Sequence, residues 1–281
     1  TPRGKNHGHS LYQMARKSNE WFCQNLTVSD TKRADGTPVI SSDTIDNERL
    51  EGMEEVLIQQ EFFGSFEAQT AGAYYADQLT KAKEEHRVGR LPIEPSLPIH
   101  TAWDLGISDA MSIWLFQALG KEIRLIGYHE NTGKGIEHYA QWLKQYASTH
   151  NVMLGTHLAP HDIEVRELTS GRSRKDVARE MGLVFRTVQR PRTKAEGIQA
   201  VRRIFPRLWI DDEKAEHGYN CIASYHREYD ARHQTFRDTP VHDWSSHGAD
   251  ALQTLALGWV ESMGTGHRPQ PSQAKVDFSV F

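Results

Sequence analysis

Hydrophobic and polar positions along the chain are irregular at first and become regular after the proline-containing segment Leu91–Pro98. Three consecutive β-favouring runs, joined by short turns, then predict an antiparallel meander over Ile99–Leu105, Ser112–Leu119 and Glu122–Tyr128. Strands and helices are expected to alternate beyond the meander, which is typical of an α/β domain. The segment Leu91–Pro98 is expected to be a linker, with a domain boundary near residue 95.

Apolar residues spaced three or four positions apart predict the helices of this second part. Two such stripes are Ile136, Tyr139, Leu143 and Ala147, and Ile198, Val201, Ile204 and Leu208. The other expected elements are a strand at Val152–Leu158, a helix at Arg174–Met181, a strand at Leu183–Val188, and helices at His217–Tyr229 and Ala249–Val260.

The first part of the chain has a looser pattern. A short amphipathic helix is expected around Leu11–Ser18, followed by a strand-like run at Trp21–Val28. Asp43–Gln60 has a helical pattern with its acids near the N-terminal end, and Tyr74–Val88 is typical of a charged helix. We therefore divide the chain into residues 1–95, an α/β domain at 96–263, and a polar tail at 264–281 that is expected to be disordered.

The order of elements favours a ribonuclease-H-like fold for the second part. This fold is a mixed five-stranded sheet of order 3-2-1-4-5 with helices on both faces, so that the first strand is central and the fourth lies beside it. The step from element order to fold is an analogy, because other α/β layouts share the pattern.

Composition describes a water-soluble chain with an uneven charge distribution. Hydrophobic residues make up 38% of the sequence, and no apolar run approaches the roughly 18–20 residues that span a bilayer. Cys23 and Cys221 are far apart, which indicates a reducing compartment rather than a disulfide framework. The net charge is −4, yet Arg166–Lys194 holds nine basic and three acidic residues. This window is either a phosphate-binding face or a solvated helix surface.

Three aspartates occupy positions where a carboxylate is costly unless it is paired or bound to a metal. Asp104 follows the first strand of the meander, Asp162 follows the strand that Pro160 ends, and Asp250 begins the last long helix. If the first and fourth strands are neighbours, all three carboxylates point toward one pocket. Each acid taken alone is equally compatible with a turn or a cap.

Three carboxylates without cysteine partners favour two hard divalent cations, Mg²⁺ or Mn²⁺. Such a pair can activate water and stabilise the leaving oxygen of a phosphodiester. His247 precedes Asp250 by three residues, so it is an added ligand, a proton carrier, or a structural histidine at the start of a helix. A zinc site of His157 and His161 is disfavoured, because their spacing falls at a strand end rather than on a helix.

The basic residues near the acids are candidates for phosphate contacts that position a duplex without reading its bases. They are Arg172, Arg174, Lys175, Arg186, Arg190, Arg192 and Lys194. Some of them are expected to be merely solvated.

Several short motifs in order resemble the nuclease domain of the large terminase subunit of tailed bacteriophages, over roughly residues 95–262. They are Trp103–Gly106, Pro160–Asp162, Thr169–Arg174, Gly197–Arg202 and His242–Ala251. Thr1–His7 resembles the end of the packaging ATPase domain of that family, and Glu61–Tyr75 its junction with the nuclease. Residues 1–95 are accordingly expected to be a small α+β remnant of the ATPase domain.

The resemblance implies that Asp104, Asp162 and Asp250 bind metal and that His247 is an accessory histidine. It implies an endonuclease that cuts concatemeric double-stranded viral DNA during packaging in the host bacterial cytoplasm. Its implied partners are DNA, the portal protein and the small terminase subunit, with no membrane.

One departure from the family is the lack of a Gly-x-x-x-x-Gly-Lys-Ser/Thr phosphate loop. The nearest string, Gly127–Gly135, has the wrong spacing. We therefore expect no ATP hydrolysis. The chain is most simply a fragment, and a monomeric state is compatible with that interpretation. Two alternatives stay open: another nuclease of the same fold, such as a resolvase or exonuclease, and a non-catalytic module that docks on DNA or portal.

Overall fold

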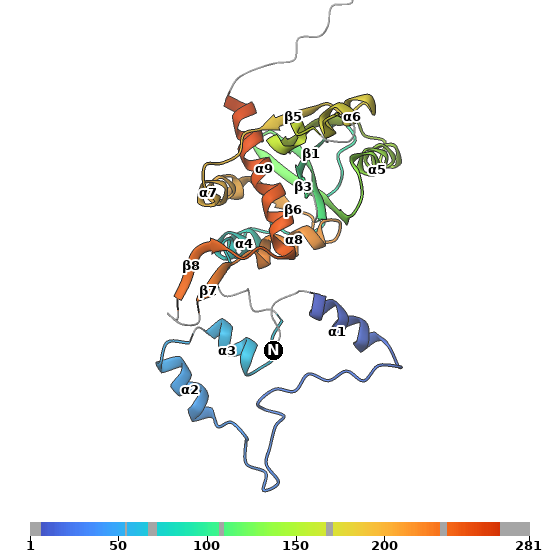
Figure 1. Ribbon diagram of the computed structural model, residues 1–281. Coiled ribbons are helices and arrows are strands. Elements are labelled where there is room, and N and C mark those ends of the chain that lie inside the picture. Colours follow the sequence, from blue (N-terminus) through green and yellow to red (C-terminus); the bar gives the residue numbers. More distant parts are fainter. Residues whose placement is uncertain are drawn as a thin grey trace, which may run out of the picture.

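A six-stranded mixed sheet forms the centre of the part of the molecule that follows α3 in the computed structural model, which describes residues 7–53, 55–66, 72–106, 110–166, 171–230 and 235–264 (Figure 1). Its strands are β1 (Ile99–Asp104), β2 (Ala110–Leu119), β3 (Glu122–Thr132), β4 (Leu154–Pro160), β5 (Phe185–Val188) and β6 (Leu208–Ile210). A separate two-stranded ribbon consists of β7 (Arg227–Asp230) and β8 (Thr235–Pro240).

Helices cover the sheet and extend from it. The α-helices are α1 (His7–Lys17), α2 (Ser42–Leu50), α3 (Glu55–Glu61), α4 (Ala76–Glu84), α5 (Ile136–Thr149), α6 (Arg174–Glu180), α7 (Lys194–Ile204), α8 (Glu216–Ser224) and α9 (Trp244–Gly264). Two short 3₁₀ turns are η1 (His161–Glu164) and η2 (Phe205–Arg207). No helix of the described segments combines the length and apolar character needed to cross a bilayer.

The strand order is β5-β4-β1-β2-β3-β6, which confirms the predicted order 3-2-1-4-5 and adds one edge strand. β1–β2 and β2–β3 are antiparallel, whereas β1–β4, β4–β5 and β3–β6 are parallel. The predicted count of five strands is therefore wrong by one. The helical stripe predicted to reach Leu208 stops earlier, because Pro206 cannot continue the ladder of α7, and Leu208–Ile210 pairs with β3 instead.

The two faces of the sheet belong to two buried clusters. One cluster joins the sheet to α4, α7, α8 and α9, and the other joins it to α5 and α6 (Figure 1). Side chains alternate between these faces along each strand. Trp103 consequently packs against Phe185 and Tyr139 in the second cluster, whereas its neighbour Asp104 faces α9. The residues of β2 from Ala110 to Phe116 are all buried, as a central strand requires.

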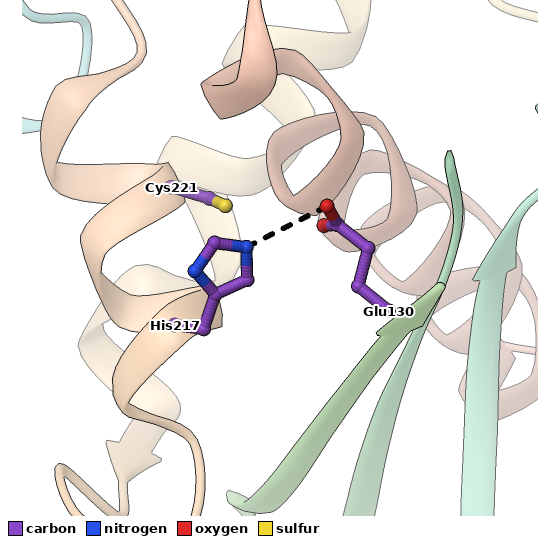
Figure 2. Close-up of side chains that lie close together, drawn as sticks. All are labelled: Glu130, His217 and Cys221. Atoms are coloured by element: carbon purple, nitrogen blue, oxygen red, sulfur yellow. Dashed lines mark ion pairs between the residues drawn. The ribbon is translucent and has the colours of Figure 1, made fainter. Parts of the chain in front are cut away.

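Helix α8 lies against β3 and also contacts α9. The contact brings His217 and Cys221 of α8 close to Glu130 of β3 (Figure 2). Tyr128, two residues before Glu130, packs on Trp114 and donates its hydroxyl hydrogen to the Glu130 carboxylate.

The segment before β1 is tied to the sheet at several points. Tyr75 and Leu79 are buried in the same cluster as α7 and α9, and the backbone of Leu91 donates to the buried Asp211. Gln117, which is fully buried, accepts from the Glu94 amide and donates to two backbone carbonyls of the expected linker. The boundary near residue 95 remains a prediction, and α4 shares a core with the sheet.

Three other expected elements differ in the structure. The helix expected at Asp43–Gln60 is two helices, because the chain turns at Gly52, whose φ of +101° favours glycine. The run Trp21–Val28 forms no strand, and Trp21 and Phe22 are exposed. The helix expected to reach Tyr229 ends at Ser224, where the backbone becomes extended and leads into β7.

Helix α9 runs from Trp244 to Gly264, so it begins before and ends beyond the expected Ala249–Val260, and Asp250 lies inside the helix rather than at its start. The expected tail beyond it lies outside the described residues, as do the turn at 107–109 and the first residues of the chain.

Two histidines lie side by side on β1 and β4, the partly buried His100 and the buried His157. His100 accepts a hydrogen bond from the Thr156 amide, and Nδ1 of His157 lies 2.7 Å from Oγ1 of Thr101. The Thr101 oxygen also accepts a hydrogen bond from Trp103 Nε1, so Thr101 links His157 to Trp103. Burial lowers the pKa of both His100 and His157 from 6.5 to about 4.

These pKa values predict a loss of stability in acid. The unfolded chain binds more protons than the folded chain between pH 6.5 and about 4, so the unfolding free energy falls as the pH is lowered through this window. The loss should reach a few kcal/mol, at about 1.4 kcal/mol per pKa unit. Urea titrations at several pH values should show a shallower pH dependence in His157→Gln, while His86→Gln, at an exposed position, keeps the original slope.

The packing of α4 predicts that the sheet domain needs residues before 95. Leu79→Ala should lower the unfolding free energy by about 2–5 kcal/mol, because Leu79 is buried among the side chains of the main cluster. Leu50→Ala, at a side chain that is 84% exposed, is the matched control and should change it little. If Leu79→Ala leaves the unfolding of the tryptophan-rich sheet unchanged, α4 is not part of that cooperative unit.

Candidate functional site

A cleft of about 540 Å³ opens beside the ends of β1 and β4, between η1, the loop after β5 and helix α9. It brings together the three predicted acids, Asp104, Asp162 and Asp250. The other residues that line it are Pro160, His161, Val188, Gln189, Arg190, Pro191, Arg192, Thr193, Lys194, Gln253, Thr254 and Leu257.

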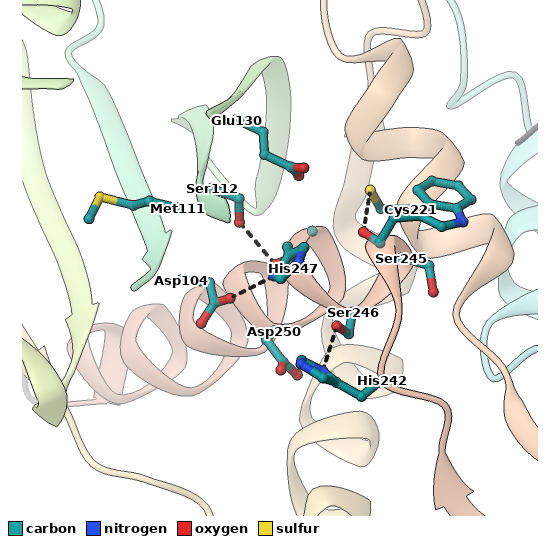
Figure 3. A network of polar contacts seen from close by, with 12 residues as sticks. Asp104, Met111, Ser112, Glu130, Cys221, His242, Ser245, Ser246, His247 and Asp250 are labelled. Carbon is teal, nitrogen blue, oxygen red and sulfur yellow. Dashed lines mark hydrogen bonds and ion pairs between the residues drawn. The ribbon is translucent and has the colours of Figure 1, made fainter. Parts of the chain in front are cut away.

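Asp104 enters the cleft from the last position of β1. It is paired in register with Ser112 of β2, and its side chain is 25% exposed. Burial raises the pKa of Asp104, and the negative charge of Asp250 adds to this, while the nearby His247 opposes it. Nδ1 of His247 lies 3.7 Å from Oδ2 of Asp104 (Figure 3). The carboxylate thus lacks full compensation for its burial, as expected of a group that binds a cation.

Asp162 is presented by the turn that follows β4. Pro160 ends the strand, and the 3₁₀ turn His161–Glu164 is held down by the buried Ile163. Nε2 of His161 lies 3.0 Å from Oδ1 of Asp162, and both side chains are close to half exposed. Asp162 is therefore the most accessible of the three acids.

Asp250 comes from α9 and has two partners. Lys194 at the start of α7 donates to both of its oxygens, at 2.9 and 2.7 Å, and Gln253 donates to Oδ1 at 2.9 Å. A Cβ atom on Gly197 of α7 would lie 2.2 Å from Gln253 Oε1, so a side chain there would displace Gln253. The glycine lets α7 lie close against α9 at this point.

The start of α9 is fixed by hydrogen bonds to β2. Ser112 Oγ donates to the carbonyl oxygen of His247 at 2.9 Å (Figure 3). Trp114 Nε1 donates to the carbonyl oxygen of Gly248 at 2.8 Å. Just before it, Asp243 accepts from the amide and hydroxyl groups of Ser245. These contacts set the position from which His247 and Asp250 approach β1.

The structure divides the predicted basic residues into two groups. Arg190, Arg192 and Lys194 line the cleft. Arg172 instead pairs with Glu180, and Lys175 with Glu164, while Arg174 begins α6 and does not line the cleft. His247 does not line the cleft either, but its Nδ1 contacts the Asp104 carboxylate.

The donor set of the cleft fits hard divalent cations. Three carboxylates face one space, and the ammonium group of Lys194 supplies positive charge to Asp250 there. Their oxygens are not all within 4.8 Å of one another; among the described residues, that spacing holds for Glu130, His217 and Cys221. Gathering the acids around ions would therefore need side-chain rotations and release of Lys194.

Some residues of the site carry no assigned role in the sequence analysis. Gln253 follows Asp250 by three residues on α9, a spacing that places both on one helix face and could have indicated their contact. His161 lines the cleft beside Asp162, whereas His157 is buried and bonds Thr101. The structure therefore gives these two histidines separate surroundings, in line with the disfavoured zinc pair.

The fold resembles solved structures of phage packaging proteins. The large terminase of a thermophilic bacteriophage has a TM-score of 0.52 and 15% identity, over 92% of this chain and 61% of that one. The chain thus spans less than two thirds of that protein. Two other similar structures are the nuclease domain of the P22 large terminase and that of the SPP1 large terminase with bound Mn.

The P22 domain has 14% identity and a TM-score of 0.45, with coverage of 61% of this chain and 86% of that one. The SPP1 domain has 10% identity and a TM-score of 0.42, with coverage of 59% and 92%. Neither a protein-family model nor a curated protein matches the sequence. At this identity the large terminase of the thermophilic phage confirms the predicted resemblance at the level of the fold.

Proposed function

We propose that this chain is a metal-dependent endonuclease that cuts double-stranded viral DNA during genome packaging. The observation that carries the proposal is the meeting of Asp104, Asp162 and Asp250, from three separate elements, in one cleft with Arg190 and Arg192. Fold likeness to large terminases is consistent with it, but many chemistries share a fold, so the site is the argument.

In this proposal the three aspartates hold two divalent cations, Mg²⁺ or Mn²⁺. When bound, the ions supply an activated water and stabilise the leaving oxygen of the cleaved phosphodiester. His247 lies against Asp104 and fixes the position of that carboxylate, and it can also hold a proton there. Lys194, once released from Asp250, is placed to contact a phosphate of the DNA.

The duplex is positioned by the basic rim of the cleft. Arg190 and Arg192 lie in the loop between β5 and α7, which lines the cleft together with the acids. Guanidinium groups bind phosphates in a bidentate manner without reading bases, so we expect weak sequence preference from these contacts.

The chain spans less than two thirds of the large terminase that it resembles, so the wider packaging role is a further part of this proposal. We propose that a packaging ATPase, the portal protein and the small terminase subunit act with this nuclease in the infected bacterial cytoplasm. Residues 1–95 would link the nuclease to the ATPase, and this chain alone would not hydrolyse ATP.

Neutralising an acid tests the catalytic proposal. Asp104→Asn and Asp250→Asn should reduce plasmid cleavage in Mn²⁺ or Mg²⁺ by more than about 100-fold, because a cation ligand is lost. Asp212→Asn, at an exposed acid outside the cleft, is the control and should cleave normally. EDTA should abolish cleavage by the unchanged protein.

The same experiment separates the alternatives. A docking module would bind DNA equally well in all three variants and show no metal-dependent cleavage. A resolvase would require branched DNA, and an exonuclease would degrade linear DNA from its ends while leaving a closed circle intact. Cleavage that persists in both Asp104→Asn and Asp250→Asn would contradict the assignment of the cleft.

The division of the basic residues predicts unequal effects on DNA binding. Replacing Arg190 and Arg192 together by alanine should weaken duplex binding and lower the salt dependence by about one unit of slope for each phosphate that is no longer neutralised. Replacing Arg172 and Lys175, which are paired with acids outside the cleft, should have a much smaller effect. Equal weakening in the two double variants would place the duplex elsewhere. Binding is measured by fluorescence anisotropy over a salt series, with Ca²⁺ in place of Mg²⁺.

A further inference from the structure

A second cluster of possible metal ligands lies apart from the acidic cleft. Glu130 of β3 and His217 and Cys221 of α8 each direct one ligand atom into a common space (Figure 2). These three atoms all lie within 4.8 Å of one another, the closest grouping of this kind in the described residues. None of the three residues lines the cleft that holds Asp104.

The backbone places these ligands without strain. His217 and Cys221 are four residues apart on α8, so their side chains project from one face of the helix, one turn apart. Glu130 lies on the strand that α8 covers. Its Oε2 accepts the Tyr128 hydroxyl hydrogen, which leaves Oε1 facing His217.

The distance between the His217 and Glu130 ligand atoms fits two ligands of one metal ion better than a direct hydrogen bond between them. Nε2 of His217 lies 3.5 Å from Oε1 of Glu130, longer than an ordinary hydrogen bond. Two ligands at about 2.0–2.2 Å from a tetrahedral zinc ion are about 3.4 Å apart. The pair therefore stands at a spacing that a zinc ion could bridge.

The ligand types of the cluster also suit a cation. Cys221 is fully buried and burial raises the pKa of its thiol, so its sulfur is uncharged until a bound ion displaces the proton. Burial also acts to raise the pKa of Glu130, but the nearby His217 imidazole and the hydrogen bond from Tyr128 outweigh it, so the pKa of this carboxyl is lowered. A thiol, an imidazole and a carboxylate together are the ligand types of zinc, whereas Mg²⁺ and Mn²⁺ prefer oxygen alone.

We propose that Glu130, His217 and Cys221 form a zinc site, distinct from the catalytic cleft, with a water molecule as the fourth ligand. Binding converts the Cys221 thiol to a thiolate, forms the Zn–S, Zn–N and Zn–O bonds, and releases the thiol proton to solvent. His217 is 55% exposed, so it leaves a path by which the ion and this proton pass.

The site would link α8 to β3 beneath the start of α9. Cys221 donates to the carbonyl oxygen of Trp244, and a Cβ atom at Gly248 would lie 2.6 Å from Cys221 Cβ. Zinc at Cys221 would therefore stabilise the position of the turn that carries His247 and, one turn later, Asp250. Its role is structural, so binding is measurable without DNA cleavage.

The test uses the full chain, reduced and freed of metal, titrated with Co²⁺ as a spectroscopic probe and then with Zn²⁺. We expect one equivalent of Co²⁺ to give near-ultraviolet thiolate-to-cobalt absorption that Zn²⁺ displaces. Calorimetry in buffers of different ionisation enthalpy should show release of about one proton per zinc. Zinc in excess should raise the melting temperature by several degrees.

Matched variants identify the ligands. Cys221→Ser should abolish the absorption, and Cys23→Ser, at the other cysteine, should keep it. His217→Ala alters an exposed side chain and should fold normally, yet weaken binding by at least about 10-fold, as should Glu130→Gln. Asp104→Asn should bind zinc unchanged even though it is expected to lose cleavage.

Three results would overturn the inference. They are no thiolate absorption in the unchanged protein, absorption that moves with Cys23 rather than Cys221, and unchanged affinity in the folded His217→Ala variant. In the first case the cluster is only a His217–Glu130 ion pair beside a buried thiol. None of these results bears on the cleft, because cleavage is measured separately with Asp104→Asn.

Discussion

The anchoring of α9 on β2 is the constraint on which the rest of the site depends. Two donors from one strand, Ser112 Oγ and Trp114 Nε1, bond the carbonyl oxygens of His247 and Gly248. These carbonyls belong to the first turns of α9, and both donors are buried, so sliding the helix would leave two unsatisfied polar groups. Because Ser112 is also the register partner of Asp104, the same strand positions the acid of β1 and the acid of α9.

The charges of the cleft favour the binding of a cation. Asp104 and Asp250 repel each other, which contributes to the raised pKa of Asp104. Lys194 offsets the charge of Asp250, and His247 that of Asp104. Both partners come from elements that also build the cleft, so the compensation is local. A divalent cation would supply the same positive charge at closer range, which is the physical basis of the nuclease proposal.

How far the sequence predicted the fold depends on whether the signal was local. The meander and the stripe of α5 follow from periodicity, whereas the order of the first five strands was predicted by analogy with a ribonuclease-H-like fold, and all are found. The wrong predictions concern segments whose structure depends on a partner far away in the sequence. β6 pairs with the edge of β3, whereas Trp21–Val28 pairs with no strand of the described residues. The local sequence pattern of a segment does not show which strand it will pair with.

The site shows the same division. The sequence by itself determined the chemical types, which are three aspartates near a strand end, a turn and a helix, and basic residues between Arg166 and Lys194. The expected position of Asp250 at the start of that helix was wrong, because α9 begins at Trp244. Only the tertiary structure decided which basic residues face the three aspartates. Arg172 pairs with Glu180 and Lys175 with Glu164, and these residues do not line the cleft. The tertiary structure alone also brought Glu130 to His217 and Cys221, about 90 residues away in the chain. Spacing along the chain fixes neighbours within a helix or strand, whereas contact between elements depends on how the whole sheet is assembled.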